Sequence, residues 1–346
     1  MKKNAPGHQK TRITLNHVAE DAGVSRSTVS LVLNGGTNLA ENTVQRVLGS
    51  IQRLGYVYNR AAASLRTNRS STVGLLVPNI QNPVFAEIAV GAEEKLDRLG
   101  KTLFLANTGE SLDRQRRALT LMREHGAEGI MICPVRGTGS GDLALVRGGM
   151  PAVFITRYTD DFPCSYVGID NAGGVAAAMD HLFKLGHTRI AFVGGQAGST
   201  AFRDRSQAVA AALRERGLPV GPESIVPANI SSEGGEHAAH AILALRERPS
   251  AVICFNDLVA LGFVSALKSR GIRPGREISV IGFDDMFAAA AFQPSLTTVH
   301  ADNVSIGRNA ALMLERLIEE GDSEPRRVIL PTGLVVREST GPYRET

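Results

Sequence analysis

The chain has 346 residues, of which 43% are hydrophobic and 21% are charged, with a formal net charge of +4. This length predicts two or three folded units, and the composition is typical of a globular protein. No apolar run approaches the ~20 residues that cross a bilayer, and no apolar stretch follows the basic N-terminus as it would in a secretion signal. We therefore expect a cytoplasmic protein with no membrane partner. Three scattered cysteines, Cys133, Cys164 and Cys254, favour buried free thiols over disulfides or a thiolate metal site.

The positive charge is concentrated at the start of the chain. Residues 1–70 hold ten Lys or Arg residues and three Asp or Glu residues, a net charge of +7, which leaves −3 for the remainder. A basic leading segment on a slightly acidic body predicts a module that binds a polyanion.

Residues 14–58 are predicted to be helical, with interruptions at glycines. Thr14 is placed to cap a first helix through its side-chain oxygen, Gly23 supplies the positive φ that ends this helix, and Ser25 caps the second. Two short helices joined by a turn of about three to four residues around a glycine predict a helix-turn-helix.

The second helix has two faces when its residues are placed at about 100° intervals. The outward face carries Arg26, Ser27, Ser30, Leu31 and Asn34, and the opposite face carries Val29, Val32 and Leu33. The apolar face is expected to pack on the first helix and on a third, at about 42–54, which leaves the outward face free to enter a DNA major groove. A merely solvated surface helix is the alternative, and the glycine turn, both caps and the +7 charge argue against it.

From residue 71 onward, strand-like and helical stretches alternate. The strand-like runs lie at 72–77, 102–106, 129–133, 152–155, 189–193, 251–255 and 278–283. The helical stretches lie at 84–99, 113–125, 172–185, 203–216, 233–246 and 258–270. This alternation predicts parallel βαβ units, and its two successive sets predict two doubly wound lobes. Because ligands bind beyond the carboxyl ends of such strands, two facing lobes predict a ligand cleft between them.

The run from Thr14 to Asn34 resembles the headpiece of the lactose-repressor/galactose-repressor family, whose pattern is VAExAGVSxxTVSxVLN. The resemblance continues through 54–65 and, in the later part, through phrases such as Val77-Pro78-Asn79, Asn256-Asp257 and 278–285. It implies an all-α helix-turn-helix headpiece over 1–58, a hinge helix and linker over 59–70, and an effector-binding α/β core over 71–346 that is similar to periplasmic sugar-binding proteins. The N-lobe is expected at about 71–170 and 301–330, and the C-lobe at about 171–300 and 331–342.

The resemblance also implies which residues contact DNA. It assigns base contacts to Arg26 and Ser27, with Leu31 one turn later, and an arginine can contact guanine bidentately. Leu31 stands where the family often has arginine, so we expect a different preference at that base pair. The residues expected to bind phosphates or stabilise the turn are Ser25, Thr28 and Asn34, and the predicted set also includes Thr14 and Ser30. In the hinge helix, which the family forms only on DNA, Leu65 would enter the minor groove, accompanied by Asn59, Ala62 and Arg66.

In the core, the resemblance implies an effector site. Asn82 would hydrogen-bond the ligand, Phe85 would cover an apolar face of it, and Arg203 would act as a forked donor. Asn256 and Asp284 would accept hydrogen bonds from ligand hydroxyls. Several alternatives stay open: Asn82 and Asn256 could simply cap helices, Phe85 could be core, Arg205 could replace Arg203, and Asp285 could replace Asp284. The family favours a sugar or sugar derivative as effector over a nucleoside-like metabolite.

Motifs of other function classes are incomplete. Gly100-Lys101-Thr102 lacks the earlier glycine of a phosphate-binding loop, and His237 and His240 lack the partners of a zinc site. We therefore predict no catalytic residue, no metal and no cofactor apart from the small-molecule effector. A periplasmic solute-binding protein is the other alternative, but it would not need a helix-turn-helix. The favoured function is a ligand-responsive transcriptional regulator, a repressor rather than an activator, which binds a pseudo-palindromic operator as a homodimer. The absence of a leucine heptad tail favours a dimer over a tetramer.

Overall fold

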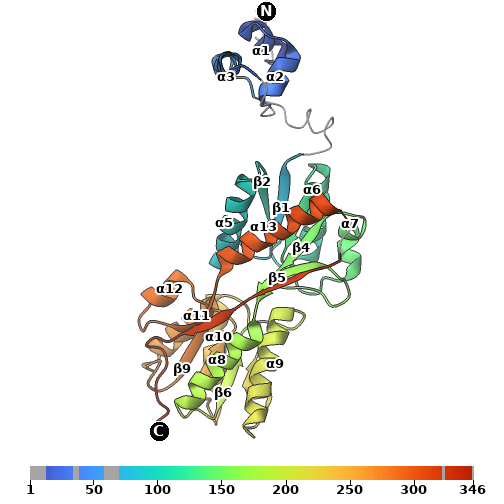
Figure 1. Ribbon diagram of the computed structural model, residues 1–346. Helices are drawn as coiled ribbons and strands as arrows, with labels where there is room; N and C mark the ends of the chain where they lie inside the picture. Colours follow the sequence, from blue (N-terminus) through green and yellow to red (C-terminus); the bar gives the residue numbers. More distant parts are fainter. Residues whose placement is uncertain (1–12, 34–38, 58–69, 322–323, 345–346) are drawn as a thin grey trace, which may run out of the picture. The chain divides into compact units, whose positions relative to one another are not determined.

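The computed structural model describes residues 13–33, 39–57, 70–321 and 324–344 (Figure 1). These residues belong to two compact units, Met1–Ser70 and Ser71–Thr346, which we treat separately. Among the described residues, no helix has the length and apolar character needed to span a bilayer.

The first unit contains three helices: α1 (Leu15–Ala22), α2 (Arg26–Leu33) and α3 (Glu41–Leu54). Gly23 ends α1 in the left-handed conformation, with φ of +61°, which a residue without a side chain adopts at little cost. Val18, Val29 and Val47, one from each helix, are fully buried against one another and form the centre of a small core. The predicted helix-turn-helix and its apolar face are therefore present.

The two predicted caps have different outcomes. The Ser25 hydroxyl accepts a hydrogen bond from the Thr28 backbone N–H at 3.1 Å, which confirms it as the cap of α2. Thr14 occupies the N-cap of α1, but its side-chain oxygen makes no capping bond. Instead, its backbone N–H donates to Nδ1 of His17 at 3.0 Å and its hydroxyl lies 3.2 Å from the same nitrogen. The predicted position of this cap is therefore confirmed, and the contacts of Thr14 there are to the His17 imidazole.

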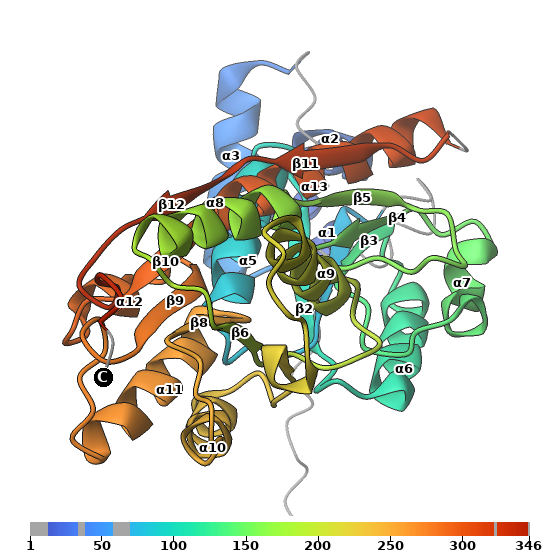
Figure 2. The same ribbon diagram turned by 90° about the horizontal axis from the view of Figure 1, so that it is seen from below.

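The second unit is built on two six-stranded sheets (Figures 1 and 2). The sheet of the N-lobe has the order β11-β5-β4-β3-β1-β2 and that of the C-lobe has the order β12-β10-β9-β8-β6-β7. The strands of the N-lobe are β1 (Thr72–Val77), β2 (Thr102–Asn107), β3 (Gly129–Ile132), β4 (Ala152–Ile155), β5 (Ser165–Ile169) and β11 (Arg327–Leu330). Those of the C-lobe are β6 (Ile190–Val193), β7 (Ile225–Val226), β8 (Ala251–Cys254), β9 (Ser279–Asp284), β10 (Thr297–Ala301) and β12 (Thr332–Val335). The β10–β12 pair is antiparallel, and the other pairs among the named strands are parallel.

Helices cover both faces of each sheet. In the N-lobe, α5 (Pro83–Asp97) and α13 (Asn303–Glu320) pack on one face, and α6 (Leu112–Glu124) and α7 (Ala144–Arg147) pack on the other. In the C-lobe, α8 (Asn171–Lys184) and α9 (Thr200–Glu215) lie opposite α10 (Ser232–Leu243) and α11 (Asp257–Ser269). The short elements are η1 (Ser140–Leu143), η2 (Pro222–Ser224) and α12 (Phe287–Ala291). Strands with helices on both faces are buried on both faces, which explains their nearly continuous apolar sequences.

The chain passes between the lobes three times: from β5 to α8, from β10 to α13, and from β11 to β12. Residues that follow the strands of both sheets line a common cavity, so the carboxyl ends of the two sets of strands face each other. This arrangement places polar side chains from two independent sheets around one space.

Candidate functional site

In the first unit, α2 presents the outward face predicted from the helical wheel. Arg26 and Ser27 are exposed, Leu31 is 45% exposed, and Ser30 is half-buried, whereas Val29 is fully buried on the other side. The Ser25 hydroxyl is also within 2.7 Å of the Ser27 hydroxyl and 2.8 Å of the Thr28 hydroxyl, which fixes the first turn of the helix. This short, capped helix therefore offers an arginine, hydroxyls and an apolar tip to a groove.

Part of the predicted DNA-binding set lies outside the described residues. This applies to Asn34, which comes after Leu33 in the sequence, and to Asn59, Ala62, Leu65 and Arg66 in the expected hinge helix. Their roles stay predictions.

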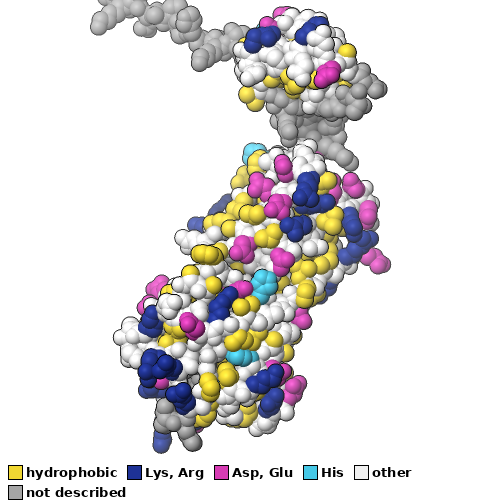
Figure 3. Space-filling view, turned by 60° about the vertical axis from the view of Figure 1, so that its left-hand side comes forward, with side chains coloured by type: hydrophobic (Ala, Val, Ile, Leu, Met, Phe, Trp, Pro, Cys, Tyr) yellow, Lys and Arg dark blue, Asp and Glu magenta, His cyan; other side chains and the backbone are white. Residues whose placement is uncertain are grey.

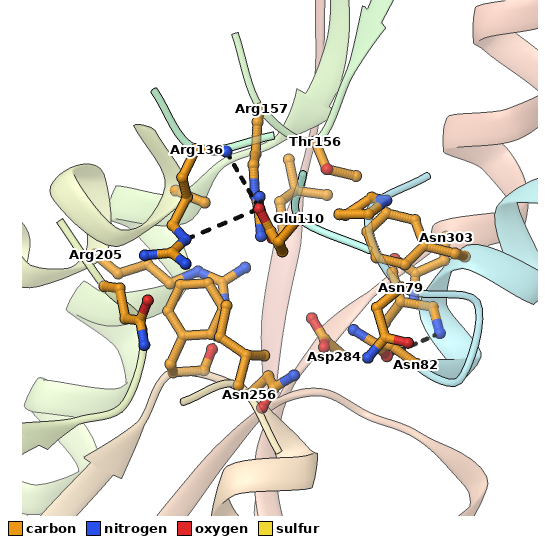
Figure 4. A pocket seen from close by; sticks show the side chains of 18 of the residues that line it. Asn79, Asn82, Glu110, Arg136, Thr156, Arg157, Arg205, Asn256, Asp284 and Asn303 are labelled. Atoms are coloured by element: carbon orange, nitrogen blue, oxygen red, sulfur yellow. Dashed lines mark hydrogen bonds and ion pairs between the residues drawn. The ribbon is translucent and has the colours of Figure 1, made fainter. Parts of the chain in front are cut away.

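In the second unit, a cavity of about 290 Å³ lies between the lobes (Figure 4). Its walls come from the segments after β1 to β4 of the N-lobe and after β6 to β9 of the C-lobe, together with the start of α13. The volume is at the small end of the range of ligand pockets, and polar groups converge on it from both sides. The position at the strand ends of two doubly wound sheets is where ligands bind in this architecture.

Asn82 and Phe85 reach the cavity from the N-terminus of α5. Asn82 is buried and its Oδ1 accepts a hydrogen bond from the Val84 backbone N–H at 3.2 Å. The residue therefore caps α5 and lines the cavity at once, because the cap uses only the side-chain oxygen. Phe85 is buried and contributes an apolar wall.

Asn256 holds the corresponding position in the C-lobe, at the N-cap of α11. Its Oδ1 accepts from the Val259 backbone N–H at 3.0 Å, and its side chain is 1% exposed. The Nδ2 atom is buried and has no hydrogen-bond partner among the described residues. A buried amide without a partner carries a free-energy penalty that a ligand acceptor would remove.

Two consecutive aspartates lie at the end of β9, Asp284 as its last residue and Asp285 directly after it, and their surroundings differ. Asp284 lines the cavity and is buried, whereas Asp285 accepts a hydrogen bond from Nη2 of Arg337 at 2.7 Å and lies 3.1 Å from Nδ1 of His300. Both have positive φ, +108° and +57°, and such strain in residues other than glycine is concentrated at functional sites. Burial raises the pKa of Asp284 to about 8, against the opposing effect of the nearby Arg205 charge.

The arginine expected at position 203 does not line the cavity. Arg203 forms an ion pair with Asp160 and donates to the Tyr158 hydroxyl at 2.9 Å, on a partly exposed surface. Arg205, two residues later on α9, lines the cavity and is 6% exposed. Arg203 therefore lies outside this cavity, contrary to the prediction, and Arg205, the alternative that the sequence left open, lines it.

The N-lobe side of the cavity holds a charged group that sequence analysis missed. Glu110 follows β2, Arg136 follows β3 and Arg157 follows β4, and all three line the cavity (Figure 4). The remaining polar members of the lining that the sequence analysis did not single out for the effector site are Asn79, Thr156, Gln196, Asn229 and Asn303. Their position directly after a parallel strand was the signal that would have found them. Among the described residues, no cluster of three or more His, Cys, Asp or Glu side chains is arranged to hold a metal ion.

Comparison with known sequences gives a consistent assignment for both units. Residues 14–59 match the family described as bacterial regulatory proteins, lacI family, and residues 179–340 match a periplasmic binding protein-like domain. The chain is 33% identical over 329 residues to the HTH-type transcriptional repressor PurR of Photobacterium profundum, covering 94% of this chain and 98% of that protein. It is 34% identical over 331 residues to PurR of Aliivibrio fischeri, with the same shares covered.

Solved structures are similar over almost the whole chain. One is a lac repressor dimer bound to operator and the anti-inducer ONPF, with a TM-score of 0.85 at 26% identity, covering 96% of this chain and all of that one. Another is the complex of the transcriptional regulator CelR with cellobiose, with a TM-score of 0.73 at 30% identity, covering 95% and 100%. The predicted family and the predicted combination of a helical headpiece with a two-lobed α/β core are confirmed.

Proposed function

The chain belongs to the lacI family of bacterial regulatory proteins and is a DNA-binding transcriptional regulator, and from this premise we propose its specific action. It binds a pseudo-palindromic operator as a homodimeric repressor and senses a sugar or sugar derivative in the cavity between its lobes. The observation that carries this proposal is the unpartnered Nδ2 of Asn256, which faces a cavity of sugar size between the two lobes.

The composition of the cavity supports a polar, hydroxylated ligand. The cap of α5 uses only Oδ1 of Asn82, so its amide nitrogen can donate to a ligand, and Nδ2 of Asn256 can do the same. Asp284 makes no side-chain hydrogen bond to a described residue. The rings of Phe85 and Phe255 supply apolar walls. Alternating hydroxyls and C–H faces of a sugar match such a surface, and a solved relative of similar fold holds cellobiose.

The outward face of α2 supports base-specific binding by the headpiece. Arg26 has the length and the donors for a bidentate contact with guanine, worth roughly 1–3 kcal/mol of discrimination. Leu31 presents an apolar tip that suits a thymine methyl group. Ser25 and Thr28 lie at the start of the helix, where hydroxyls and backbone N–H groups bind phosphate and set the register.

The edge of the N-lobe sheet supports a homodimer. β2 is the edge strand of this sheet, and its Phe104 and Leu105 are 47% and 41% exposed. Val90 on the adjacent α5 is also exposed, and Figure 3, which turns the α5 side forward, shows hydrophobic side chains gathered there. An open, apolar strand edge is a liability in a monomer and is expected to be covered. A two-fold dimer would place two headpieces on two half-sites.

Effector and operator would be coupled through the relative position of the lobes. A ligand that contacts Asn82 in the N-lobe and Asp284 in the C-lobe binds one lobe arrangement better than another. The ligand changes the DNA affinity only by the difference between its binding free energies for the two lobe arrangements, which is typically on the order of 1–3 kcal/mol.

The proposal is tested by selecting operators from genomic fragments with the full-length protein and measuring their affinity with and without sugars. Arg26→Ala is expected to weaken the selected operator about 10- to 100-fold and random duplex far less. Arg53→Ala removes the same charge from α3 and serves as the control. Equal losses on operator and random DNA, or a protein that selects no sequence, would exclude base-specific binding through this face.

A further inference from the structure

The cavity holds more cationic than anionic side chains. Three arginines line it, Arg136 and Arg157 from the N-lobe and Arg205 from the C-lobe, against two carboxyl groups, Glu110 and Asp284. The count alone does not define a site, because paired charges cancel. The hydrogen bonds decide which charges remain uncompensated.

On the N-lobe side, both carboxylate oxygens of Glu110 accept hydrogen bonds, and Arg157 is the arginine whose guanidinium donates one of them. Its Oε1 accepts from Nη1 of Arg157 at 2.7 Å, and its Oε2 accepts from the backbone N–H of Arg136 at 3.1 Å. The Arg136 guanidinium lies at the edge of an ion-pair distance, with Nε 3.9 Å from Oε2, and it makes no side-chain hydrogen bond to any described residue. Glu110 thus neutralises Arg157, and the fork of Arg136 stays open toward the cavity (Figure 4).

On the C-lobe side, Arg205 is held but not neutralised. Its Nε donates to Oδ1 of Asn171 at 2.8 Å and its Nη1 donates to the Phe255 carbonyl, so both partners are uncharged. The guanidinium also stacks on the Phe283 ring, 3.6 Å from its centroid. Within the described residues it forms no ion pair. Among the acids, Asp284 has the largest electrostatic effect on Arg205, and burial raises the pKa of Asp284 to about 8. At neutral pH that carboxyl is therefore largely protonated.

We propose that the effector is an acid, a polyhydroxylated molecule of about one sugar unit whose carboxylate or phosphate group binds between Arg136 of the N-lobe and Arg205 of the C-lobe. This inference rests on the proposed effector site and specifies the chemical class of its ligand. The guanidinium fork matches both anions bidentately, and the low dielectric of a cavity strengthens the pairing. The hydroxylated part of the molecule would lie against Asn82, Asn256 and Asp284.

The two arginines also give the anion a role in lobe closure. Two guanidinium groups that face one space from different lobes repel each other, which opposes approach of the lobes. An anion between them reverses the sign of that interaction. A neutral sugar would fill the same volume without this effect.

The test compares matched compounds on the full-length protein at constant ionic strength, by thermal shift and calorimetry. The panel contains neutral hexoses, the hexonates and hexuronates derived from them, hexose 6-phosphates, and inorganic phosphate as the smallest probe. We expect at least one acid to bind about 10- to 100-fold more tightly than its neutral parent. Carboxylate and phosphate arms identify which anion the site prefers.

Two variants test whether Arg136 is responsible for the preference for the acid. Arg136→Gln, which removes the charge and keeps a polar side chain, is expected to abolish the preference for the acid and the stabilisation by phosphate. Arg203→Gln removes a charge from the same lobe boundary outside the cavity and should change neither. Operator binding by both variants without ligand is measured in parallel, so that a failure of the DNA-binding proposal is seen separately. A neutral sugar that binds as tightly as its acid, an unchanged preference in Arg136→Gln, or no stabilisation by any anion of the panel would overturn the proposal.

Discussion

Arg46 of α3 donates two hydrogen bonds to the carbonyl oxygen of Ala22, from Nε at 3.1 Å and from Nη2 at 2.5 Å. The Ala22 carbonyl ends α1 and has no partner within its own helix, and Nη2 also reaches the Gly23 carbonyl at 3.0 Å. One side chain of α3 thus fixes the turn from which α2 starts.

Arg46→Ala is expected to destabilise the headpiece by about 1–3 kcal/mol, because two turn carbonyls lose a charged donor. Hydrogen exchange on the full-length protein measures this as faster exchange of amides in α1 and α2. The control is Arg53→Ala, whose exposed ion pair with Asp21 is worth less than about 1 kcal/mol. Similar exchange in both variants would show that the Arg46 bonds do not hold the turn.

The packing of α5 against α13 depends on two glycines. A Cβ atom at Gly91 would overlap the Val304 carbonyl oxygen, and one at Gly307 would overlap the Ile88 carbonyl oxygen. Gly91→Ala would force the helices apart and is expected to lower the stability of the core by about 1–3 kcal/mol or more. Thermal unfolding measures the loss. Gly141→Ala, where an added Cβ meets nothing within 4 Å, should leave the transition unchanged, and equal transitions for the two variants would contradict the close approach.

The buried carboxyl of Asp284 predicts a pH dependence of stability. Its pKa in the folded protein is about 8, against the ordinary value of 3.8 for an aspartate, so between these values the folded state binds more protons than the unfolded state. The contribution of this group to the free energy of unfolding is fully present below about pH 4 and is lost as the pH rises toward 8. Asp284→Asn lacks this loss. The free energy of unfolding of the variant, relative to that of the wild type, should therefore rise by about 2 kcal/mol or more between pH 5 and pH 8.

Chemical unfolding of both proteins across this pH range provides the measurement. Asp257, whose pKa burial raises to about 7, is present in both proteins, and its charge also contributes to the raised pKa of Asp284. A difference that stays constant with pH would mean that Asp284 is ionised in the folded protein.

The fold was predictable from the sequence because its signals are local and periodic. Apolar runs such as 72–77 and 251–255 became β1 and β8 because both faces of a parallel strand are buried. Gly23 and Ser25 marked the helix-turn-helix because each performs its function within a few residues of chain.

The side chains of the site were harder to predict because their direction depends on how each helix or strand is rotated about its own axis in the fold. Arg203 and Arg205 are two residues apart on α9, which turns their side chains by about 200° relative to each other. The sequence contained both arginines but did not define which face of α9 meets the cavity. Glu110, Arg136 and Arg157 stand in loops after strands, where no periodicity predicts a direction. Their mutual pairing depends on the folded sheet, in which β3 and β4 are neighbours and β2 is separated from β3 by β1.

The exposed edge of β2 leads to a prediction about assembly. Phe104 and Leu105 point to opposite sides of an edge strand and are both more than 40% exposed, so a partner strand or helix that covers this edge would bury both. Phe104→Glu would place a charge in that contact and is expected to weaken a homodimer by at least about tenfold, because burying an unpaired carboxylate is costly. Sedimentation of the full-length protein over a dilution series measures the dissociation constant. Leu121→Glu introduces the same charge at a similarly exposed leucine on α6 and should sediment as the wild type does. If the Phe104→Glu protein remains dimeric at the same dilutions as the wild type, the dimer interface does not lie at this edge. A wild-type protein that sediments as a monomer would exclude the dimer itself.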